Sequence, residues 1–263
     1  MKRGLLLAVA VCIGIFSFGG LVFSAGSGDI RKTKHNFSAT GAGSPIQNIH
    51  ATTETQVCVF CHTPHRALTN GPLWNHSMST VKSYTLYHTS TLLSPLPAGN
   101  MPDGDSLLCL SCHDGDQPIG AVQNVGGLAT TISMTGTNLS GGKLIGPTSF
   151  GSILDGHHPI SIEISDCLRS NKTTECPTLP IAWKLQAVID PDYLKATANR
   201  YTPPIGYTCA TADHPGTGVQ CSSCHDAHSP NWMFLRVPDS PTDPWGNRIY
   251  SDTLCLKCHV ACP

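Results

Sequence analysis

The chain carries little charge and almost no net charge. Asp, Glu, Lys and Arg together make up 13% of its 263 residues, and the formal net charge is −1. A protein that binds nucleic acid or an anionic membrane usually presents an excess of Lys and Arg. The sequence has no such excess, so we expect neither kind of partner.

The sequence is also poor in the side chains that build a large core. Aromatic residues account for only 6% of it, whereas 25 glycines and 20 prolines favour turns. The hydrophobic pattern indicates no long helix and no large sheet. We therefore expect a mostly irregular chain with short helices and few short strands, whose side chains alone make a thin core.

The one apolar run of membrane length lies at the N-terminus. Lys2 and Arg3 precede an apolar run over residues 4–23, which ends in small residues. This pattern predicts a secretory signal peptide over residues 1–25, with a retained single-pass anchor as the alternative. Export favours a secreted, extracellular location, or alternatively the periplasm.

Four copies of the pattern Cys-x-x-Cys-His form the strongest signal in the sequence. With 13 cysteines and 13 histidines, random placement predicts only about 0.03 such motifs in a chain of this length. The cysteine pairs are Cys58 and Cys61, Cys109 and Cys112, Cys221 and Cys224, and Cys255 and Cys258. The histidines that follow them are His62, His113, His225 and His259.

This motif is the attachment signature of c-type haem. Two cysteines at this spacing can form thioethers to the vinyl groups of one haem, and the adjacent histidine then binds the iron as proximal ligand. Zinc is the alternative, but zinc sites usually bring two CxxC pairs within about 15 to 20 residues of each other. Zinc also gives no reason for a histidine after every pair. We expect four covalently bound haem c groups, whose apolar faces supply core surface.

The two C-terminal motifs repeat the two N-terminal ones. VCVFCHTPH is similar to QCSSCHDAH, and SLLCLSCHDG is similar to DTLCLKCHVA. The repeat predicts two-haem units over residues 26–125 and 217–263, joined by a linking insert over residues 126–216. Within the insert, alternating polarity predicts a short strand over residues 158–165, and residues 191–199 could form about two turns of helix.

Nine histidines outside the motifs and the leader could supply second axial ligands. An iron with two histidine ligands has no open position for substrate, which favours electron transfer over catalysis. His65 and His228 are predicted distal ligands because each follows a proximal histidine by three residues, about one helical turn. His158 is favoured over His157 because Pro159 biases its backbone toward an extended conformation.

The sequence does not decide whether His35 or His76 is the fourth distal ligand. His35 lies in an N-terminal arm that would be a surface segment in a monomer, although such an arm can reach a neighbouring subunit. We favour His35. Methionine as an axial ligand is the weaker alternative, since histidine is plentiful.

Four cysteines of the mature chain lie outside the motifs, and in an exported protein they predict two disulfides. Cys167 and Cys176 are close in sequence and form the local choice, which leaves Cys209 to pair with Cys262, but three pairings are possible. The four are Cys167, Cys176, Cys209 and Cys262.

Several segments together resemble the multihaem cytochromes with doubled motifs that metal-respiring bacteria secrete. Among these, the chain is most similar to tetrahaem cytochromes that polymerise into extracellular filaments, the outer-membrane cytochrome E type. The segments are KHNFSATG, VCVFCHTPH, PLWNH, SLLCLSCHDG, HPISIEIS, CSSCHDAH, and FLRV with LCLKCH. They cover nearly the whole mature chain.

The resemblance implies closely stacked bis-histidine haems that continue from subunit to subunit of a homopolymer. Its partners would be further copies of itself, periplasmic and outer-membrane cytochromes, and extracellular acceptors such as metal oxides. In that family a histidine of one subunit can ligate a haem of the next, and we match His35 to that role.

Three functions compete at this point. The leading hypothesis is a subunit of an extracellular conductive filament, and a soluble monomeric periplasmic electron carrier is the alternative, since it needs the same haems. The third is a multihaem reductase, which requires an iron with an open coordination position. No CxxCK variant occurs in the sequence, so we expect a protein that is not an enzyme.

Overall fold

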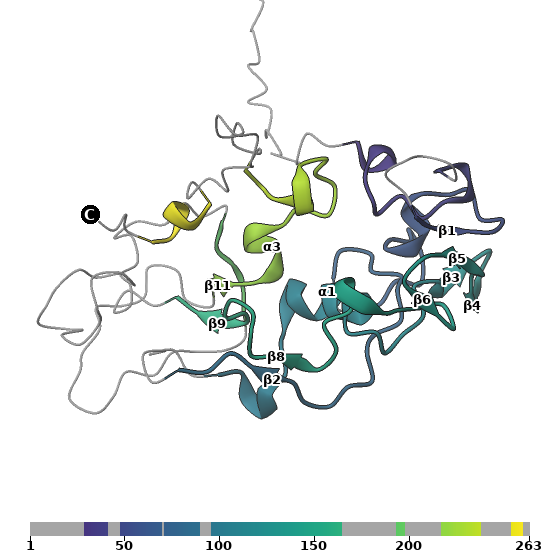
Figure 1. The fold of residues 1–263 in the computed structure, drawn as a ribbon. Helices are drawn as coiled ribbons and strands as arrows, with labels where there is room; N and C mark the ends of the chain where they lie inside the picture. The colour runs from purple at the N-terminus through teal and green to yellow at the C-terminus, as the bar shows by residue number, and fades with distance from the viewer. Residues whose placement is uncertain are drawn as a thin grey trace, which may run out of the picture.

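Irregular segments connect short helices and strands through most of the chain (Figure 1). The computed structural model describes residues 29–41, 48–69, 71–89, 96–164, 193–197, 217–237 and 254–259. The prediction of a mostly irregular fold with short helices and strands is confirmed. None of the helices in these ranges is both long and apolar enough to cross a membrane. The expected signal peptide and the four cysteines predicted to form disulfides lie outside the described residues.

A helical turn forms at each of the four attachment motifs. The longest is α1 (Gly104–His113), which carries the second motif and ends before Gly115, a residue in the left-handed conformation typical of helix ends. The other turns are η3 (Cys58–Phe60), α3 (Cys221–Cys224) and η9 (Cys255–Lys257). The remaining 3-10 turns are η1 (Ile30–Lys32), η2 (Ala39–Gly41), η4 (Ala98–Asn100), η5 (Gly146–Thr148) and η8 (Trp232–Phe234).

The strands are two to five residues long and pair in small sheets. Antiparallel pairs join β1 (Ile49–Ala51) to β5 (Met134–Gly136), β3 (Ala121–Val125) to β4 (Leu128–Thr131), and β6 (Leu139–Ser140) to β7 (Lys143–Leu144). A parallel pair joins β2 (Thr85–Leu86) to β8 (Ile153–Leu154). A three-stranded antiparallel sheet has the order β10 (Lys195–Ala196), β11 (Thr217–Val219), β9 (Ile162–Glu163). Figure 1 shows β1 and β3–β6 gathered at one end of the molecule and β9 and β11 toward the other.

Two local predictions within the linking insert have different outcomes. The strand expected over residues 158–165 is present in shorter form as β9. The helix expected over residues 191–199 is wrong for the part that the structure describes, because Lys195 and Ala196 form β10. Pairing of β10 with β11 buries Leu194 against Ile162 and Val219, and such tertiary contacts outweigh local helix propensity.

Strand pairing ties the described part of the insert to both predicted units. The hairpin of β3 and β4 crosses residue 125, where the first unit was expected to end. Further on, β5 pairs with β1 and β8 pairs with β2, both from the first unit. β9 then pairs with β11, which leads directly into the third attachment motif. The insert therefore lies between the units as shared sheet structure.

The buried apolar residues form several small clusters, and three of these include residues of an attachment motif. Val59 and Phe60 of the first motif pack with Ala51, Val122 and Ile132. Leu110 of the second motif packs with Tyr84, Leu86 and Leu154, while Cys258 of the fourth packs on the cluster of Ile162, Ile164, Leu194 and Val219. A fourth cluster contains Ile49, Ile119 and Leu144. The small core that the composition predicted is thus built around the motifs.

Candidate haem-binding site

Three motif histidines are oriented by backbone carbonyl groups. A carbonyl oxygen only accepts hydrogen bonds, so the ring nitrogen beside it, Nδ1, carries the proton. The other nitrogen, Nε2, then keeps its lone pair, which is the form that binds a metal. The three Nδ1 to oxygen distances are 2.9 Å from His62 to Pro72, 2.8 Å from His113 to Thr148 and 2.8 Å from His225 to Met233.

Three motif histidines also face a second histidine from a distant part of the chain. The ring centroids are 6.3 Å apart for His62 and His228, 6.2 Å for His113 and His35, and 6.3 Å for His259 and His158. Two imidazoles on opposite sides of one metal ion, each with a nitrogen about 2.0 to 2.1 Å from it, have ring centres about 6 Å apart. The three pairs therefore have the spacing of two axial ligands of one iron.

One distance of this kind would not be informative by itself. Trp74 also lies 6.3 Å from His62, in an edge-on arrangement. The informative feature is that the spacing recurs at three of the four motifs, each time with another histidine as the partner. Two of the three partner rings also fit a metal ligand, because Nδ1 of His35 lies 3.2 Å from the carbonyl oxygen of Ala227, and Nδ1 of His158 lies 2.9 Å from that of Pro159.

The predicted distal histidines are therefore placed differently from one another. His35, His158 and His228 each lie opposite a motif histidine, and His35 does so within its own chain. His65 is exposed, and no ring of the described residues packs against it. No ring contact joins His225 to a second histidine among those residues, although His225 lies close enough to His113 to add to the effect of burial in lowering the pKa of that ring.

His76, the other candidate for the fourth ligand, is almost fully buried at 1% exposure and has both ring nitrogens engaged. Its Nδ1 lies 2.8 Å from the carbonyl oxygen of Ser77, and its Nε2 lies 3.0 Å from that of Pro118. Burial lowers the pKa of His76 and so favours the neutral ring, whose single N–H can donate to only one of the two carbonyl groups at a time. With neither nitrogen directed at another histidine, His76 serves to join two backbone segments in this structure.

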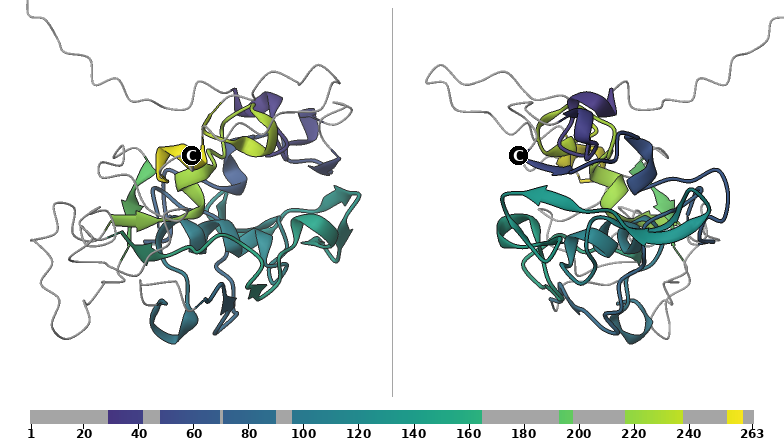
Figure 2. Two further views of the ribbon diagram at one scale, coloured as in Figure 1. Left: turned by 60° about the vertical axis from the view of Figure 1, so that its left-hand side comes forward. Right: turned by 90° about the vertical axis from the view of Figure 1, so that its right-hand side faces the viewer.

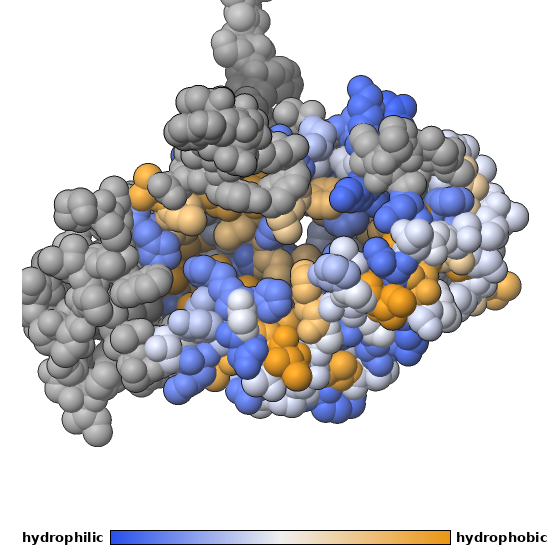
Figure 3. All heavy atoms as spheres, in the orientation of Figure 1, coloured by the Kyte–Doolittle hydropathy of each residue, from blue (hydrophilic) through white to orange (hydrophobic). Residues whose placement is uncertain are grey.

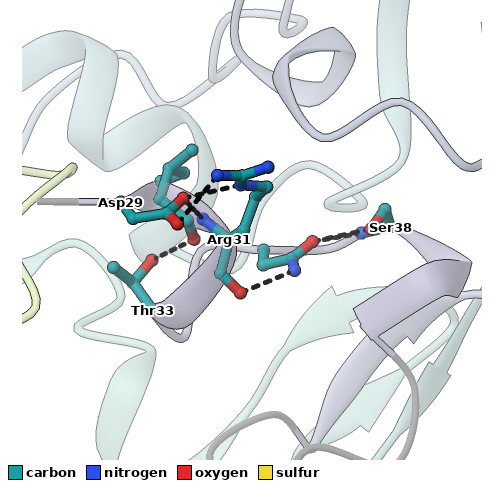
Figure 4. Close-up of polar contacts among 6 residues, drawn as sticks. Asp29, Arg31, Thr33 and Ser38 are labelled. Carbon is teal, nitrogen blue, oxygen red and sulfur yellow. Dashed lines mark hydrogen bonds and ion pairs between the residues drawn. The ribbon is translucent and has the colours of Figure 1, made fainter.

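The segment that carries His35 is held by its own polar residues (Figure 4). Asp29 caps η1 and pairs with Arg31, with an Nε to Oδ1 distance of 2.8 Å. Thr33 Oγ1 donates to the carbonyl oxygen of Ile30 at 2.9 Å and accepts from the His35 amide at 3.2 Å. Figure 2 shows this N-terminal segment beside the loop that follows α3.

Asn36 completes the support around His35. Its Nδ2 donates to the carbonyl oxygen of Arg31 at 2.9 Å, and its Oδ1 accepts from the hydroxyl of Ser38 at 2.7 Å. Asn36 is 6% exposed and Ser38 is fully buried. A buried hydrogen-bonded turn thus fixes the backbone on either side of the ring.

Burial favours neutral side chains at several positions of the site, although not at Cys221, where a hydrogen bond with Cys109 lowers the pKa to about 7. Burial lowers the pKa of His35 to about 4, and the nearby His113 adds to this effect. Burial also raises the pKa of Cys61 and of Cys112 to about 12. Within the described residues, His, Cys, Asp and Glu nowhere gather in groups of three or more as a metal-ion site would require.

An open pocket of about 400 Å³ lies beside the first motif. Cys58 and His62 line it together with the apolar side chains of Val59, Leu73 and Val125. Its volume falls in the range of about 300 to 1,000 Å³ that is typical of cofactor sites. On the face drawn in Figure 3 the surface beside α1 and α3 is also hollowed, with apolar surface inside the hollow.

The first and third motifs share a return loop that the sequence did not reveal. Backbone amides one residue after the histidine, Thr63 and Asp226, donate to the carbonyls of Leu73 and Phe234 at 2.9 and 2.7 Å. Two residues further along each loop, the amides of Asn75 and Arg236 donate to Cys61 and Cys224 at 2.9 and 3.0 Å. Leu73 and Phe234 both adopt left-handed backbone conformations, with φ of 57° and 60°. The resemblance between the motifs therefore extends to their structure.

Sequence reasoning also missed two aromatic rings that pack on the predicted ligands. Phe234 stacks on His35 with centroids 4.1 Å apart, and Phe150 stacks on His113 at 5.4 Å. Phe150 lies far from any motif in sequence, so no spacing rule could have indicated it. FLRV, which includes Phe234, was noted only through the resemblance.

No protein-family model matches the chain, and a comparison with curated proteins finds no match.

Proposed function

We propose that the chain is a tetrahaem c-type cytochrome that transfers electrons along closely spaced bis-histidine haems. The observation that carries this proposal is the set of three histidine pairs at 6.2 to 6.3 Å, each containing a motif histidine. When bound, a haem of this kind supplies a one-electron couple at an iron whose axial positions are both occupied.

The residues of the chain would hold and orient these groups. The paired cysteines of each motif supply thioethers, and the motif histidine supplies the proximal nitrogen. His228, His35 and His158 supply distal nitrogens opposite His62, His113 and His259. Where a backbone carbonyl group lies at Nδ1, as at His35, His62, His113, His158 and His225, it fixes the ring tautomer and makes the imidazole a more basic ligand.

The test is expression in a host that attaches haem, followed by mass measurement and spectroscopy of the purified protein. Four haems per chain and a low-spin ferric spectrum are expected. Substituting both cysteines of one motif with Ala should remove one haem. A colourless protein, or a protein whose mass equals that of the chain alone, would contradict the proposal.

We further propose that the protein assembles head to tail into an extracellular filament, as its resemblance to filament-forming cytochromes suggests. The two motif loops are structural repeats, and His228 of the third motif reaches His62 of the first. In the repeat, His65 corresponds to His228 and His225 corresponds to His62, so His65 should reach His225. Within one chain, however, His65 is exposed. If His65 reaches His225 of a second copy, the contact is heterologous and repeats without closing.

The alternative is the monomeric electron carrier, and the position of His35 favours it. His35 lies opposite His113 in the same chain, so this ligand does not require a neighbour. Negative-stain microscopy of the secreted protein separates the two proposals. Filaments that disappear in His65→Ala, with four haems retained, support head-to-tail assembly, whereas small uniform particles in the unsubstituted protein support the carrier.

A further inference from the structure

Helix α1, which carries the second motif, begins without a cap from its own N-terminal residue. Asp103 occupies the N-cap position, but its side chain accepts no hydrogen bond from the helix. The amide of Ser106, in the first turn, instead donates to Oε1 of Gln220 at 3.2 Å, across 114 positions of sequence. The first amides of a helix need such partners, because the helix itself supplies none.

Asp103 is engaged by the same glutamine. Nε2 of Gln220 donates to Asp103 Oδ1 at 2.7 Å, and Thr197 Oγ1 donates to Asp103 Oδ2 at 3.0 Å. Oε1 of Gln220 also accepts from the hydroxyl of Ser106 at 2.5 Å and from that of Ser161 at 3.2 Å. Both ends of the amide are therefore used, and Gln220 is 1% exposed.

Gln220 is at the same time the N-cap of α3, the helix of the third motif. It forms a capping box with Ser223, in which the backbone amide of Gln220 donates to Ser223 Oγ at 3.0 Å. One buried side chain thus caps two helices that belong to different predicted units. The arrangement ties the starting points of both helices to a single residue.

The two helices meet at the cysteines that open their motifs. The thiol of Cys109 hydrogen-bonds to Cys221, and the amide of Cys221 donates to Ser106 Oγ at 3.0 Å. The hydroxyl of Ser222 donates to Asp105 beside this contact. Figures 1 and 2 both show α3 adjacent to α1.

We propose that Gln220 is a positioning residue that sets the distance between the second and third haem attachment sites. Electron transfer between the haems of the second and third motifs would cross this junction, so Gln220 would control the rate of that step. This inference rests on the proposed function, because it requires haems at Cys109 and Cys221. It does not depend on whether the protein is a filament or a monomer.

The test compares Gln220→Met with Gln123→Met in the protein loaded with haem. Gln123 lies in β3 and donates to Ser77 Oγ at 2.7 Å, so its substitution removes an amide hydrogen bond away from the junction. Gln220→Met should speed hydrogen exchange at the amides of Ser106 and Cys221. It should also slow electron redistribution after pulsed partial reduction severalfold, because the rate of electron transfer falls exponentially as the distance between donor and acceptor grows.

A rescue variant distinguishes positioning from general stability. Asp103→Asn combined with Gln220→Glu exchanges donor and acceptor in the hydrogen bond between these two side chains. This double variant should show the hydrogen-exchange and electron-redistribution rates of the unsubstituted protein. Should Gln220→Met bind less haem, Ser106→Ala removes the hydroxyl contacts to Gln220 and Cys221 and is measured in the same way. If Gln220→Met and Ser106→Ala bind four haems and show unchanged rates of hydrogen exchange and of electron redistribution, the inference is overturned. If the unsubstituted protein binds no haem, the proposed function is overturned instead.

Discussion

The ring of Phe234 stacks on that of His35, with centroids 4.1 Å apart and planes inclined by 14°. Phe234 belongs to the return loop of the third motif, whereas His35 lies opposite His113 of the second motif. His35, within the first predicted unit, is therefore linked to the second unit through Phe234. The stack also limits rotation of the His35 ring, whose plane is inclined by 63° to that of His113.

Replacing Phe234 by Leu should loosen this ring without removing it. Aromatic pairs contribute about 0.5 to 1.5 kcal/mol beyond the area that they bury, so the thermal midpoint should fall modestly. The electron paramagnetic resonance signal of one low-spin haem should shift, because that signal depends on the angle between the axial ring planes. Met233→Leu is the control, since Met233 is exposed and supplies only its carbonyl group. Equal spectra for both variants would contradict the role of the stack.

Substitutions at His35 and His76 should have opposite consequences. His35→Ala should produce one haem with an open axial position, visible as a high-spin ferric signal. His76→Ala should leave the haem spectra unchanged but lower the free energy of unfolding by about 1 to 3 kcal/mol, because a buried ring is lost together with its hydrogen bond to a backbone carbonyl group. Spectra combined with denaturant unfolding test both statements, and a high-spin signal in His76→Ala would show that His76 is a ligand.

Sequence reasoning was most informative where chemistry demands particular residues at a fixed spacing. The four motifs were evident because thioether attachment and proximal ligation require two cysteines and a histidine within one turn. The loop-rich fold followed from the scarcity of aromatic residues and the abundance of Gly and Pro. Both features are local or compositional, so no knowledge of tertiary contacts was needed.

The remaining features depend on contacts between distant residues. Nothing in the local sequence of Lys195 and Ala196 shows that β11 will pair with them and override the expected helix. The sequence likewise left His35 and His76 open, because the difference between them lies in what surrounds each ring. Capping of α1 by Gln220 spans 114 positions, far beyond the reach of any capping pattern.

Leu73 should tolerate Asn better than Val. Its φ of 57° lies in the left-handed region, where Asn is tolerated and β-branched residues are strained, and its side chain is 53% exposed. We expect Leu73→Val to be less stable than Leu73→Asn by about 1 kcal/mol in denaturant unfolding. Leu128, exposed on strand β4, is the matched control, and there Val should be the more stable of the two. The same order at both positions would contradict this account of Leu73.

Asp116 should make stability depend on pH at the acid end. Its Oδ2 accepts hydrogen bonds from the amide and hydroxyl of Thr80 at 2.6 and 2.9 Å, and the bond from the amide is the largest cause that lowers its pKa below the ordinary value of 3.8. Because the folded pKa is the lower one, the stabilisation is present above pH 3.8 and is lost as the pH falls through the folded pKa.

Asp116→Asn should therefore lower the free energy of unfolding near neutral pH and remove this part of the acid dependence. The carboxylate is accessible to solvent, so the effect should be below about 1 kcal/mol. Denaturant unfolding of both proteins over a series of pH values measures it. Asp155→Asn, at an exposed position, is the matched control for replacing an aspartate by asparagine elsewhere on the surface. A profile for Asp116→Asn that parallels the unsubstituted protein down to the lowest pH would show that the bonds to Thr80 do not stabilise the fold.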